Sequence, residues 1–400
     1  MALNLSYRIN KITVSPTMKI AQQAIEMKAR GENLIDLTVG EPDFPTPQNI
    51  KEAAIKSIEN NFTKYTINSG IYELRKAISE KLRIENNLEY KPEEIIVSSG
   101  AKQSIFNAIL SIVEDDDEVI IPAPYYVSYP HIVSLSNGKS VFIHTDEETE
   151  FKITPEQLKN AITEKTKLLI LCNPSNPTGS LYSRKDLEKL IPILEEGEFY
   201  ILSDEIYEKI IYDNNEFVSL ASLSEKIKRK TITINGFSKS YSMTGWRIGY
   251  AAGPQEIINA MNKIQSHSTS NTSSISQKAA LEALTGQKDF IEYSQKEFEK
   301  RRNLLYDELT SIKGLKCYKP QGAFYLFPNI SSFFGKKNSN QIIQSSFDFA
   351  LYLLQTEKVA VVPGSAFGAD EYIRLSYSTS EENLIEGARR IKNAIAKLED

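Results

Sequence analysis

Short apolar segments alternate with amphipathic segments through the middle of the chain, and no other feature limits the fold as strongly. The strand-like runs are rich in Ile, Leu, Tyr and Thr and lie at residues 94–99, 166–172, 198–204, 230–236 and 249–253. Segments with helical spacing follow two of these runs, at 102–113 and 184–195. Because strands that alternate with helices are typical of parallel sheets, we predict an α/β fold with a mostly parallel sheet and helices on both faces.

The two ends of the chain have a different pattern. Residues 17–30, with Thr17 as a possible N-cap, and residues 47–60 have helical spacing, and a short strand is predicted at 34–38 between them. The long charged stretch 286–310 predicts a helix that joins two domains. We therefore predict three parts, namely an N-terminal segment with part of a small domain (1–48), a large domain (49–290), and a linking helix with the rest of the small domain (291–400).

The charge and composition exclude several classes of protein. The formal net charge is −5, whereas nucleic-acid-binding proteins usually carry a basic face. No apolar run reaches the roughly 18 residues that a membrane span requires, and the first residues lack the apolar core of a signal peptide. The two cysteines are far apart and suggest no disulfide framework. We predict a cytoplasmic protein that has neither a nucleic-acid nor a membrane partner.

The common catalytic motifs are missing from the chain. Its three histidines fall in no metal-ligand spacing such as HExxH, so we predict no metal site. There is no GxSxG motif of the serine hydrolases, and there is no GxxxxGK[ST] or GxGxxG motif for nucleotides. The chemistry that remains is based on lysine.

One lysine lies in an unusual setting. The stretch GFSKSYSMTGWRIGY at 236–250 places Lys239 between two serines, eight residues before Arg247. The main covalent role of a lysine amine is to form a Schiff base with an aldehyde. In enzymes that aldehyde is usually pyridoxal phosphate, which also acts as an electron sink. This cofactor requires an acid at its ring nitrogen, donors to its ring oxygen, a stacking partner and a cradle for its phosphate.

The ends of the predicted strands offer candidates for the ring. Asp204 ends the run 198–204 and could face the ring nitrogen, and Tyr207, three residues later, could donate to the ring oxygen. The motif NPSNPTG after 166–172 offers the amides of Asn173 and Asn176. Taken one at a time, each of these residues has an ordinary structural explanation; together, at strand ends, they predict a cofactor site.

Other candidates could hold the phosphate and stack on the ring. The strand–turn–helix junction SSGAKQ offers Ser99, Gly100, Ala101 and Lys102, and a helix start of this kind binds phosphate. Arg247 could add a bidentate charged contact. In PAPYYVSYP, either Tyr125 or Tyr126 could stack on a flat ring.

With these motifs the chain resembles the pyridoxal-phosphate-dependent aminotransferases of fold type I, class I/II, and most closely subgroup Ib, which contains bacterial aspartate aminotransferases. The resemblance runs from about residue 10 to the C-terminus. It is carried by GEPDF (40–44), TKYT (63–66), SSGAKQ (98–103), PYYVSYP (124–130), NPSNPTG (173–179), SDEIY (203–207), SKSYSMTGWRIGY (238–250), GAFYLF (322–327), VVPGSAFG (361–368) and IRLSY (373–377). It implies a seven-stranded sheet in the large, cofactor-binding domain and a smaller α+β domain built from both chain ends.

The resemblance also implies how the cofactor is held. Lys239 would form the Schiff base and act as the catalytic base, Asp204 would pair with the pyridinium nitrogen, and Tyr207 and Asn176 would hold the ring oxygen. Tyr126 would stack on the ring.

The phosphate contacts follow from the same resemblance. Arg247 and the turn formed by Gly100, Ala101 and Lys102 would hold the phosphate. Tyr65 would reach the phosphate of a neighbouring subunit, which implies a homodimer with shared active sites.

For the substrate, the resemblance implies that Arg374 binds the α-carboxylate, helped by the Gly40 backbone and Asn176. The second arginine by which subgroup Ia reads a distal carboxylate has no match here. In subgroup Ib this role falls to Lys102 of the other subunit, Ser15 and Thr17.

Two positions depart from the family pattern. Many relatives carry Trp where this chain has Tyr126, so the ring N–H that reaches the substrate carboxylate is replaced by a phenol. Relatives that also use prephenate tend to carry a lysine at the position of Thr13, which argues against prephenate.

The predicted reaction is transfer of the amino group from L-aspartate to 2-oxoglutarate, which gives oxaloacetate and L-glutamate. Another amino donor (alanine, an aromatic amino acid or kynurenine), the use of prephenate, and a lyase reaction remain alternatives. A non-catalytic effector-binding module of the same fold is a further alternative, although residues 1–15 are too short for a DNA-binding head.

Overall fold

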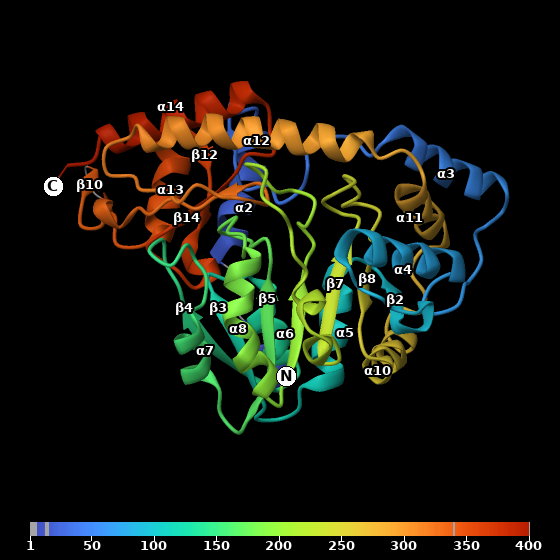
Figure 1. Cartoon of the computed structure of the whole chain (residues 1–400). Helices are drawn as coiled ribbons and strands as arrows, with labels where there is room; N and C mark the ends of the chain where they lie inside the picture. Colours follow the sequence, from blue (N-terminus) through green and yellow to red (C-terminus); the bar gives the residue numbers. More distant parts are fainter. Residues whose placement is uncertain (1–5, 13–15, 339–340, 400) are drawn as a thin grey trace, which may run out of the picture.

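The computed structural model describes residues 6–12, 16–338 and 341–399. Its largest sheet has seven strands in the order β2-β8-β7-β6-β5-β3-β4 (Figure 1). In that order the strands are Ile95–Ser98, Gly249–Ala252, Thr231–Gly236, Tyr200–Asp204, Thr166–Cys172, Glu118–Ala123 and Lys139–His144. Strands β7, β6, β5, β3 and β4 are parallel, and β8 is antiparallel to both of its neighbours. The predicted α/β fold with a mostly parallel sheet is confirmed.

Helices cover both faces of this sheet. On one face lie α5 (Ala101–Ile112), α6 (Ser128–Leu135) and α10 (Gln255–Ser266). On the other face lie α4 (Tyr72–Asn86), α7 (Pro155–Ala161), α8 (Arg184–Glu196), α9 (Glu225–Lys228) and α11 (Ser274–Thr285), and α3 (Gln48–Glu59) packs on α11. Alternate residues of a strand face opposite sides; accordingly Leu168 packs in one core and Leu169 in the other. Burial on both faces explains the continuous apolar runs in the sequence.

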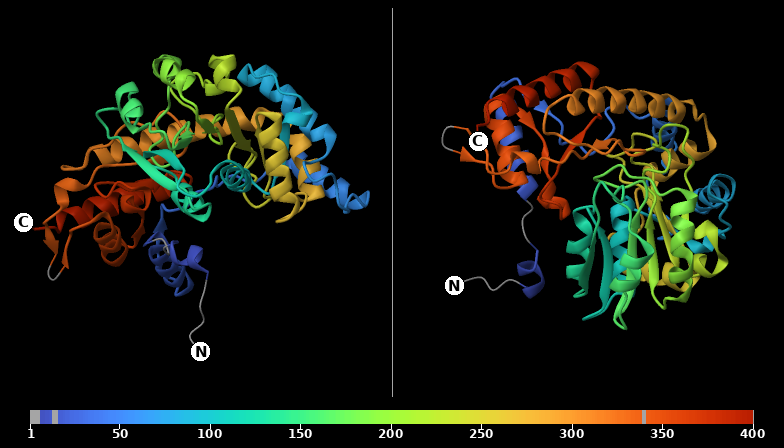
Figure 2. Two further views of the ribbon diagram at one scale, coloured as in Figure 1. Left: turned by 90° about the horizontal axis from the view of Figure 1, so that it is seen from below. Right: turned by 60° about the vertical axis from the view of Figure 1, so that its left-hand side comes forward.

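Segments from both ends of the chain pack together beside the large sheet (Figure 2). Strand β1 (Ile35–Asp36) pairs in parallel with β12 (Val359–Ala360), and β9 (Tyr325–Leu326), β13 (Val362–Pro363) and β14 (Ile373–Ser376) form an antiparallel sheet. Helices α2 (Pro16–Ala29), α13 (Ser346–Glu357) and α14 (Glu381–Ala396) surround them. The described chain also contains the short elements α1 (Tyr7–Asn10), β10 (Lys337–Asn338) and β11 (Gln341–Ile342). The division at residues 48 and 290 stays a prediction.

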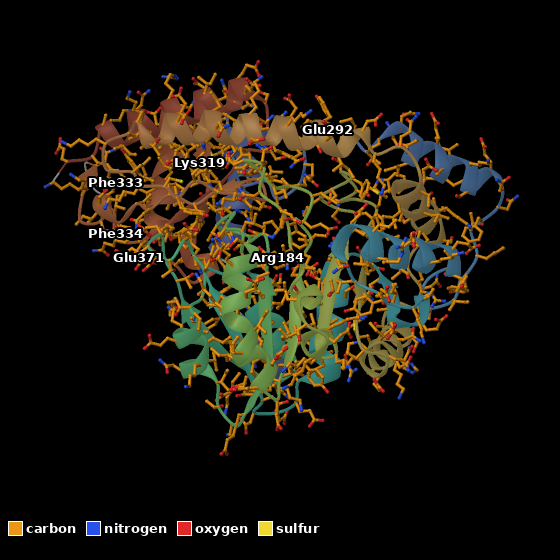
Figure 3. All side chains as sticks on the ribbon, viewed as in Figure 1. Arg184, Glu292, Lys319, Phe333, Phe334 and Glu371 are labelled. Carbon is orange, nitrogen blue, oxygen red and sulfur yellow. The ribbon has the colours of Figure 1, made fainter. Side chains whose placement is uncertain are left out.

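Helix α12 (Asp289–Thr310) is the helix predicted from the charged stretch, and it lies along α14 (Figure 1). Phe298, Leu305 and Leu309 are buried on one side of it, a spacing typical of an amphipathic helix. Glu292 lies on the outer surface, where it pairs with Lys296 (Figure 3). A long helix with one apolar stripe can therefore pack on the rest of the protein and keep its charged side in solvent.

The prediction of Thr17 as a helix cap is wrong. Helix α2 begins at Pro16, which is favoured at the first helical position, so Thr17 lies inside the first turn. Within the described ranges, no helix is long and apolar enough to cross a membrane.

Candidate active site

A cavity of about 480 Å³ lies at the carboxyl ends of the parallel strands. These ends meet at one edge because Cys172 of β5 is in register with Asp204 of β6, and Asp204 with Ile234 of β7. This edge is where α/β sheets bind their ligands. Most of the predicted site residues line the cavity, namely Gly40, Ala101, Lys102, Tyr126, Asn176, Asp204, Tyr207, Lys239, Arg247 and Arg374.

The remaining predicted residues lie elsewhere or are not described. Gly100 immediately precedes α5, next to Arg247. Tyr65 is 89% exposed and does not line the cavity. Ser15 and Thr13 lie outside the described residues, and the structure describes the backbone of Thr17 but not its side chain.

Lys239 follows β7, which ends at Gly236, and reaches the cavity from the sheet edge. Its Nζ donates a hydrogen bond of 2.6 Å to the carbonyl oxygen of Gly40. Burial lowers the pKa of the Lys239 ammonium to about 8, although the negative charge of Glu41 opposes this shift. The amine is therefore partly neutral near pH 8, the form that can react with a carbonyl group.

Asp204, the last residue of β6, is 4% exposed, and hydrogen bonds fix both of its carboxylate oxygens. Its Oδ2 accepts a hydrogen bond of 2.7 Å from Tyr129 Oη, and its Oδ1 accepts one of 3.3 Å from the N–H of Ile206. Burial raises the pKa of Asp204 to about 6, and these two hydrogen bonds and the charge of Lys239 oppose the rise. At neutral pH most of this group is ionised, which suits an acid that faces a protonated ring nitrogen.

Tyr207 lies three residues beyond Asp204, and its hydroxyl is 2.9 Å from the hydroxyl of Tyr325. Burial raises the pKa of Tyr207 well above its ordinary value. The phenol therefore keeps its proton at neutral pH and can donate a hydrogen bond to a ligand oxygen.

The start of α5 and Arg247 form a cradle that fits a phosphate. Gly100 has a φ of +90°, and a Cβ at this position would lie 2.3 Å from Nη2 of Arg247. Arg247 Nη1 donates a hydrogen bond of 2.9 Å to the Thr244 carbonyl oxygen, which orients the guanidinium. A helix N-terminus and a guanidinium side by side present N–H donors and positive charge to the same anion. Only a glycine leaves room for this arrangement.

Tyr126, and not its neighbour Tyr125, lines the cavity. Lys102 Nζ lies 5.4 Å from the centre of the Tyr126 ring. Tyr125 stacks instead on Phe142, with ring centres 5.0 Å apart. Of the two tyrosines, Tyr126 is therefore the one placed to contact a ligand in the cavity. Asn173, which also does not line the cavity, accepts a hydrogen bond from the Tyr182 N–H.

Arg374 on β14 is a buried cation with neutral partners. Its Nη1 donates to Asn176 Oδ1 at 3.1 Å, and its Nη2 donates to the Thr38 carbonyl oxygen at 2.9 Å. Its guanidinium lies 4.4 Å from the centre of the Tyr325 ring. Among the described residues, its Nε has no hydrogen-bond partner and no carboxylate pairs with it. Because a buried charge is costly without an opposite charge, this geometry fits an anionic ligand.

These features together fit pyridoxal phosphate, with an amine, a buried carboxylate, a phenol donor, an aromatic face and a phosphate cradle around one cavity. In the part of the chain that the structure describes, no group of His, Cys, Asp or Glu side chains could hold a metal ion.

Sequence reasoning assigned no role to several residues that line the cavity, namely Thr38, Tyr129, Cys172, Ser238 and Tyr325. Tyr129 could have been found in PYYVSYP, because it lies only three residues after Tyr126. Tyr325 lies in the motif GAFYLF, but nothing in that motif indicates that its ring would lie under Arg374.

Comparisons with known proteins agree with this geometry. The sequence pattern of the family described as aminotransferase class I and II matches residues 32–391. An aspartate aminotransferase of Bacillus subtilis (strain 168) is 48% identical over 398 residues, which cover 99% of this chain and 100% of the relative. A protein of Rickettsia prowazekii (strain Madrid E) named probable aspartate/prephenate aminotransferase is 50% identical over 392 residues, 98% of each chain. The crystal structure of the aspartate aminotransferase from Rhizobium meliloti superposes with a TM-score of 0.96 at 45% identity and covers 100% of both chains.

Proposed function

The chain belongs to the class I and II aminotransferases, and from this premise we propose that it transfers the amino group of L-aspartate to 2-oxoglutarate, giving oxaloacetate and L-glutamate. Its cofactor is pyridoxal 5'-phosphate. When bound, the cofactor supplies an aldehyde for amine exchange and an electron sink for the negative charge at the substrate Cα. The observation that carries the proposal is Arg374, a buried guanidinium with neutral partners on the wall of the same cavity as Lys239.

In the proposed reaction, Arg374 binds the substrate α-carboxylate through a charged pair of hydrogen bonds, and Asn176 keeps the guanidinium in place. The bound carboxylate would hold the substrate Cα within the cavity that Lys239 lines. Nζ of Lys239, whose pKa is about 8, takes the Cα proton and returns it later, as a base that titrates near the working pH should.

The other residues would hold the cofactor. Asp204 would keep a negative charge at the ring nitrogen, and Tyr207 would donate to the ring oxygen together with Asn176. Arg247 and the backbone N–H groups at Gly100 and Ala101 would bind the phosphate, and Tyr126 would lie against the ring.

An acidic donor requires a second positive group for its distal carboxylate. We propose Lys102 for this role, with Ser15 and Thr17. In the structure Lys102 lines the cavity of its own chain, and its action across a subunit interface stays a prediction. Support for an acidic donor comes from relatives named aspartate aminotransferase, while the Rickettsia name keeps prephenate as a second candidate.

We also propose a cytoplasmic homodimer with shared active sites. Tyr65 is 89% exposed, so it is free to reach a neighbouring subunit as the family resemblance implies. Sedimentation of the cofactor-loaded protein should give a mass of two chains, and a single-chain mass would contradict the shared site.

The test of the proposed function is the visible absorption spectrum of the cofactor-loaded protein, recorded before and after addition of L-aspartate. We expect the cofactor band to be replaced by that of the aminated cofactor, and 2-oxoglutarate to restore it. The same titrations with L-alanine, L-phenylalanine and L-kynurenine measure donor preference. If the protein responds to one of these amino acids but not to L-aspartate, it is still an aminotransferase, but the proposal that L-aspartate is its donor is wrong.

The pH dependence of cofactor capture should report on Lys239. We expect the protein freed of cofactor to react with pyridoxal phosphate at a rate that rises through about pH 8, because the amine must be neutral and burial has lowered its pKa from 10.5 to about 8. The rate of growth of the absorption band after rapid mixing measures this midpoint. A rate that continues to rise to about pH 10, as for an ordinary lysine, would show that the amine is not buried in this way.

Replacement of Arg374 should weaken substrate binding and leave the cofactor in place. Hydrogen bonds to a charged group contribute about 1.5–3 kcal/mol, so Arg374→Gln should raise the apparent Kd for L-aspartate about 10- to 10²-fold. A spectral titration with L-aspartate measures the effect, and Arg374→Lys, which retains the charge, should recover part of it. An unchanged Kd in Arg374→Gln would contradict the proposed carboxylate site.

A further inference from the structure

Tyr129 lies on α6 with its ring and hydroxyl fully buried, 2% exposed in all. Its Oη donates the 2.7 Å hydrogen bond to Oδ2 of Asp204. A buried hydroxyl needs a partner, and here the partner is the carboxylate assigned to the cofactor ring. The hydroxyl therefore fixes the rotation of the Asp204 side chain at the floor of the cavity.

The ring of Tyr129 has a second contact. It packs edge-on against Tyr126, with ring centres 5.4 Å apart and planes at 80°. Aromatic pairs prefer this edge-to-face geometry. Because Tyr126 is the aromatic side chain that lines the cavity, one tyrosine contacts both the acid and the stacking ring.

We propose that Tyr129 is a positioning residue for amino transfer, which fixes the Asp204 carboxylate through its hydroxyl and the Tyr126 ring through its own ring. The inference rests on the proposed function, since it assigns Tyr129 a role in that reaction. Tyr129 acts through Asp204, to which its hydroxyl is bonded.

The chemistry of the surroundings supports this role. The groups that face Asp204 are Tyr129 from α6, Cys172 from β5, Lys239 after β7 and the N–H of Ile206. Among these side chains, Tyr129 is uncharged and donates a hydrogen bond directly to the Asp204 carboxylate. Hydrogen bonds to the charged form favour that form. The hydrogen bond from Tyr129 lowers the pKa of Asp204 against the effect of burial. Without the phenol that pKa would rise, so a proton between the ring nitrogen and the carboxylate would move from the nitrogen to the carboxylate.

The test is Tyr129→Phe, which removes one oxygen and keeps the ring against Tyr126. We expect kcat to fall about 10- to 10²-fold with little change in KM for L-aspartate, since a hydrogen bond to a charged group contributes an amount equivalent to this factor. The second readout is the ¹⁵N chemical shift of ring-labelled pyridoxal phosphate bound to the protein. In Tyr129→Phe this shift should move toward the value of an unprotonated pyridine.

Tyr182→Phe is the matched control. Tyr182 is equally buried, its hydroxyl accepts one hydrogen bond of 2.8 Å from the Ile153 N–H, and it does not line the cavity. Both variants lose one buried hydroxyl, so their thermal unfolding midpoints should fall by similar amounts. The ¹⁵N shift and kcat should change only in Tyr129→Phe.

Combination with Asp204→Asn gives an independent measurement. If the hydroxyl acts through the Asp204 charge, Tyr129→Phe should lower kcat only slightly further in a chain that already carries Asp204→Asn. A double variant whose loss of kcat equals the product of the two single losses would overturn the proposal. An unchanged ¹⁵N shift in Tyr129→Phe would also overturn it. A wild-type chain that does not turn over L-aspartate would refute the proposed function instead, and the ¹⁵N shift, which requires only the bound cofactor, would still decide the role of Tyr129.

Discussion

A Lys239→Ala variant is expected to retain pyridoxal phosphate and to lose about 10⁴-fold or more in kcat, the upper range for removal of a general base. The reason is the position of the amine. Lys239 combines a pKa lowered to about 8 with a place on the cavity wall near Asp204 and Arg374. Lys102 also lines the cavity, but its Nζ lies at the face of Tyr126. Steady-state transamination and the absorption of bound cofactor measure the two effects separately, and near-normal turnover would contradict the assignment of Lys239.

Lys230→Ala is the matched control for this variant. Lys230 immediately precedes β7 and Lys239 follows it, so the two lysines flank the same strand at opposite edges of the sheet. Burial lowers the pKa of Lys230 as well, and its Nζ donates a hydrogen bond of 2.6 Å to the Gly197 carbonyl oxygen. We expect its removal to leave kcat unchanged. An equal loss in both variants would mean that damage to β7, and not the missing amine, explains the result.

The strands that could be predicted from the sequence are those that are buried on both faces and therefore apolar throughout. The runs at 166–172 and 198–204 contain β5 and β6, which lie in the interior of the sheet. Strands β3 and β4 were not identified, for two physical reasons. Strand β3 (Glu118–Ala123) contains Pro122, a residue that argues against a central strand, and β4 (Lys139–His144) is a partly exposed edge strand with a weak apolar pattern.

The site residues that could be predicted from the sequence are those in motifs that directly follow a strand. Asp204 and the NPSNPTG motif follow parallel neighbours, and the carboxyl ends of parallel strands meet at one edge, so their proximity follows from the fold class. The same reasoning could not choose between Tyr125 and Tyr126, because adjacent residues differ only in the direction of their side chains. It also could not find Tyr325 beside Arg374. That contact depends on the pairing of β9 with β14, which joins Tyr325 to Ser376 in register.

Replacement of Asp204 by Asn is expected to lower kcat by about 10²- to 10³-fold, a typical cost of losing one electrostatic contact to developing charge. Asparagine has nearly the same shape and can still accept the hydrogen bond from Tyr129. What it lacks is the negative charge that would hold the ring nitrogen protonated. The affinity for pyridoxal phosphate should fall as well, and equilibrium titration of the cofactor-free protein measures it. Unchanged affinity and rate together would refute the role of Asp204.

Glu205→Gln separates this electrostatic effect from disturbance of the chain at the end of β6. Glu205 is the next residue, is equally buried, and does not line the cavity. Its Oε1 accepts hydrogen bonds from Ser203 and Ser219 at 2.9 and 2.6 Å, and burial raises its pKa to about 7. Because this carboxyl is about half protonated near neutral pH and lies outside the cavity, its amide is a close substitute, and we expect kcat and cofactor affinity to stay near the wild-type values. A large loss in Asp204→Asn alone would assign the effect to the charge that faces the cavity, whereas equal losses in both variants would assign it to the packing of the strand end.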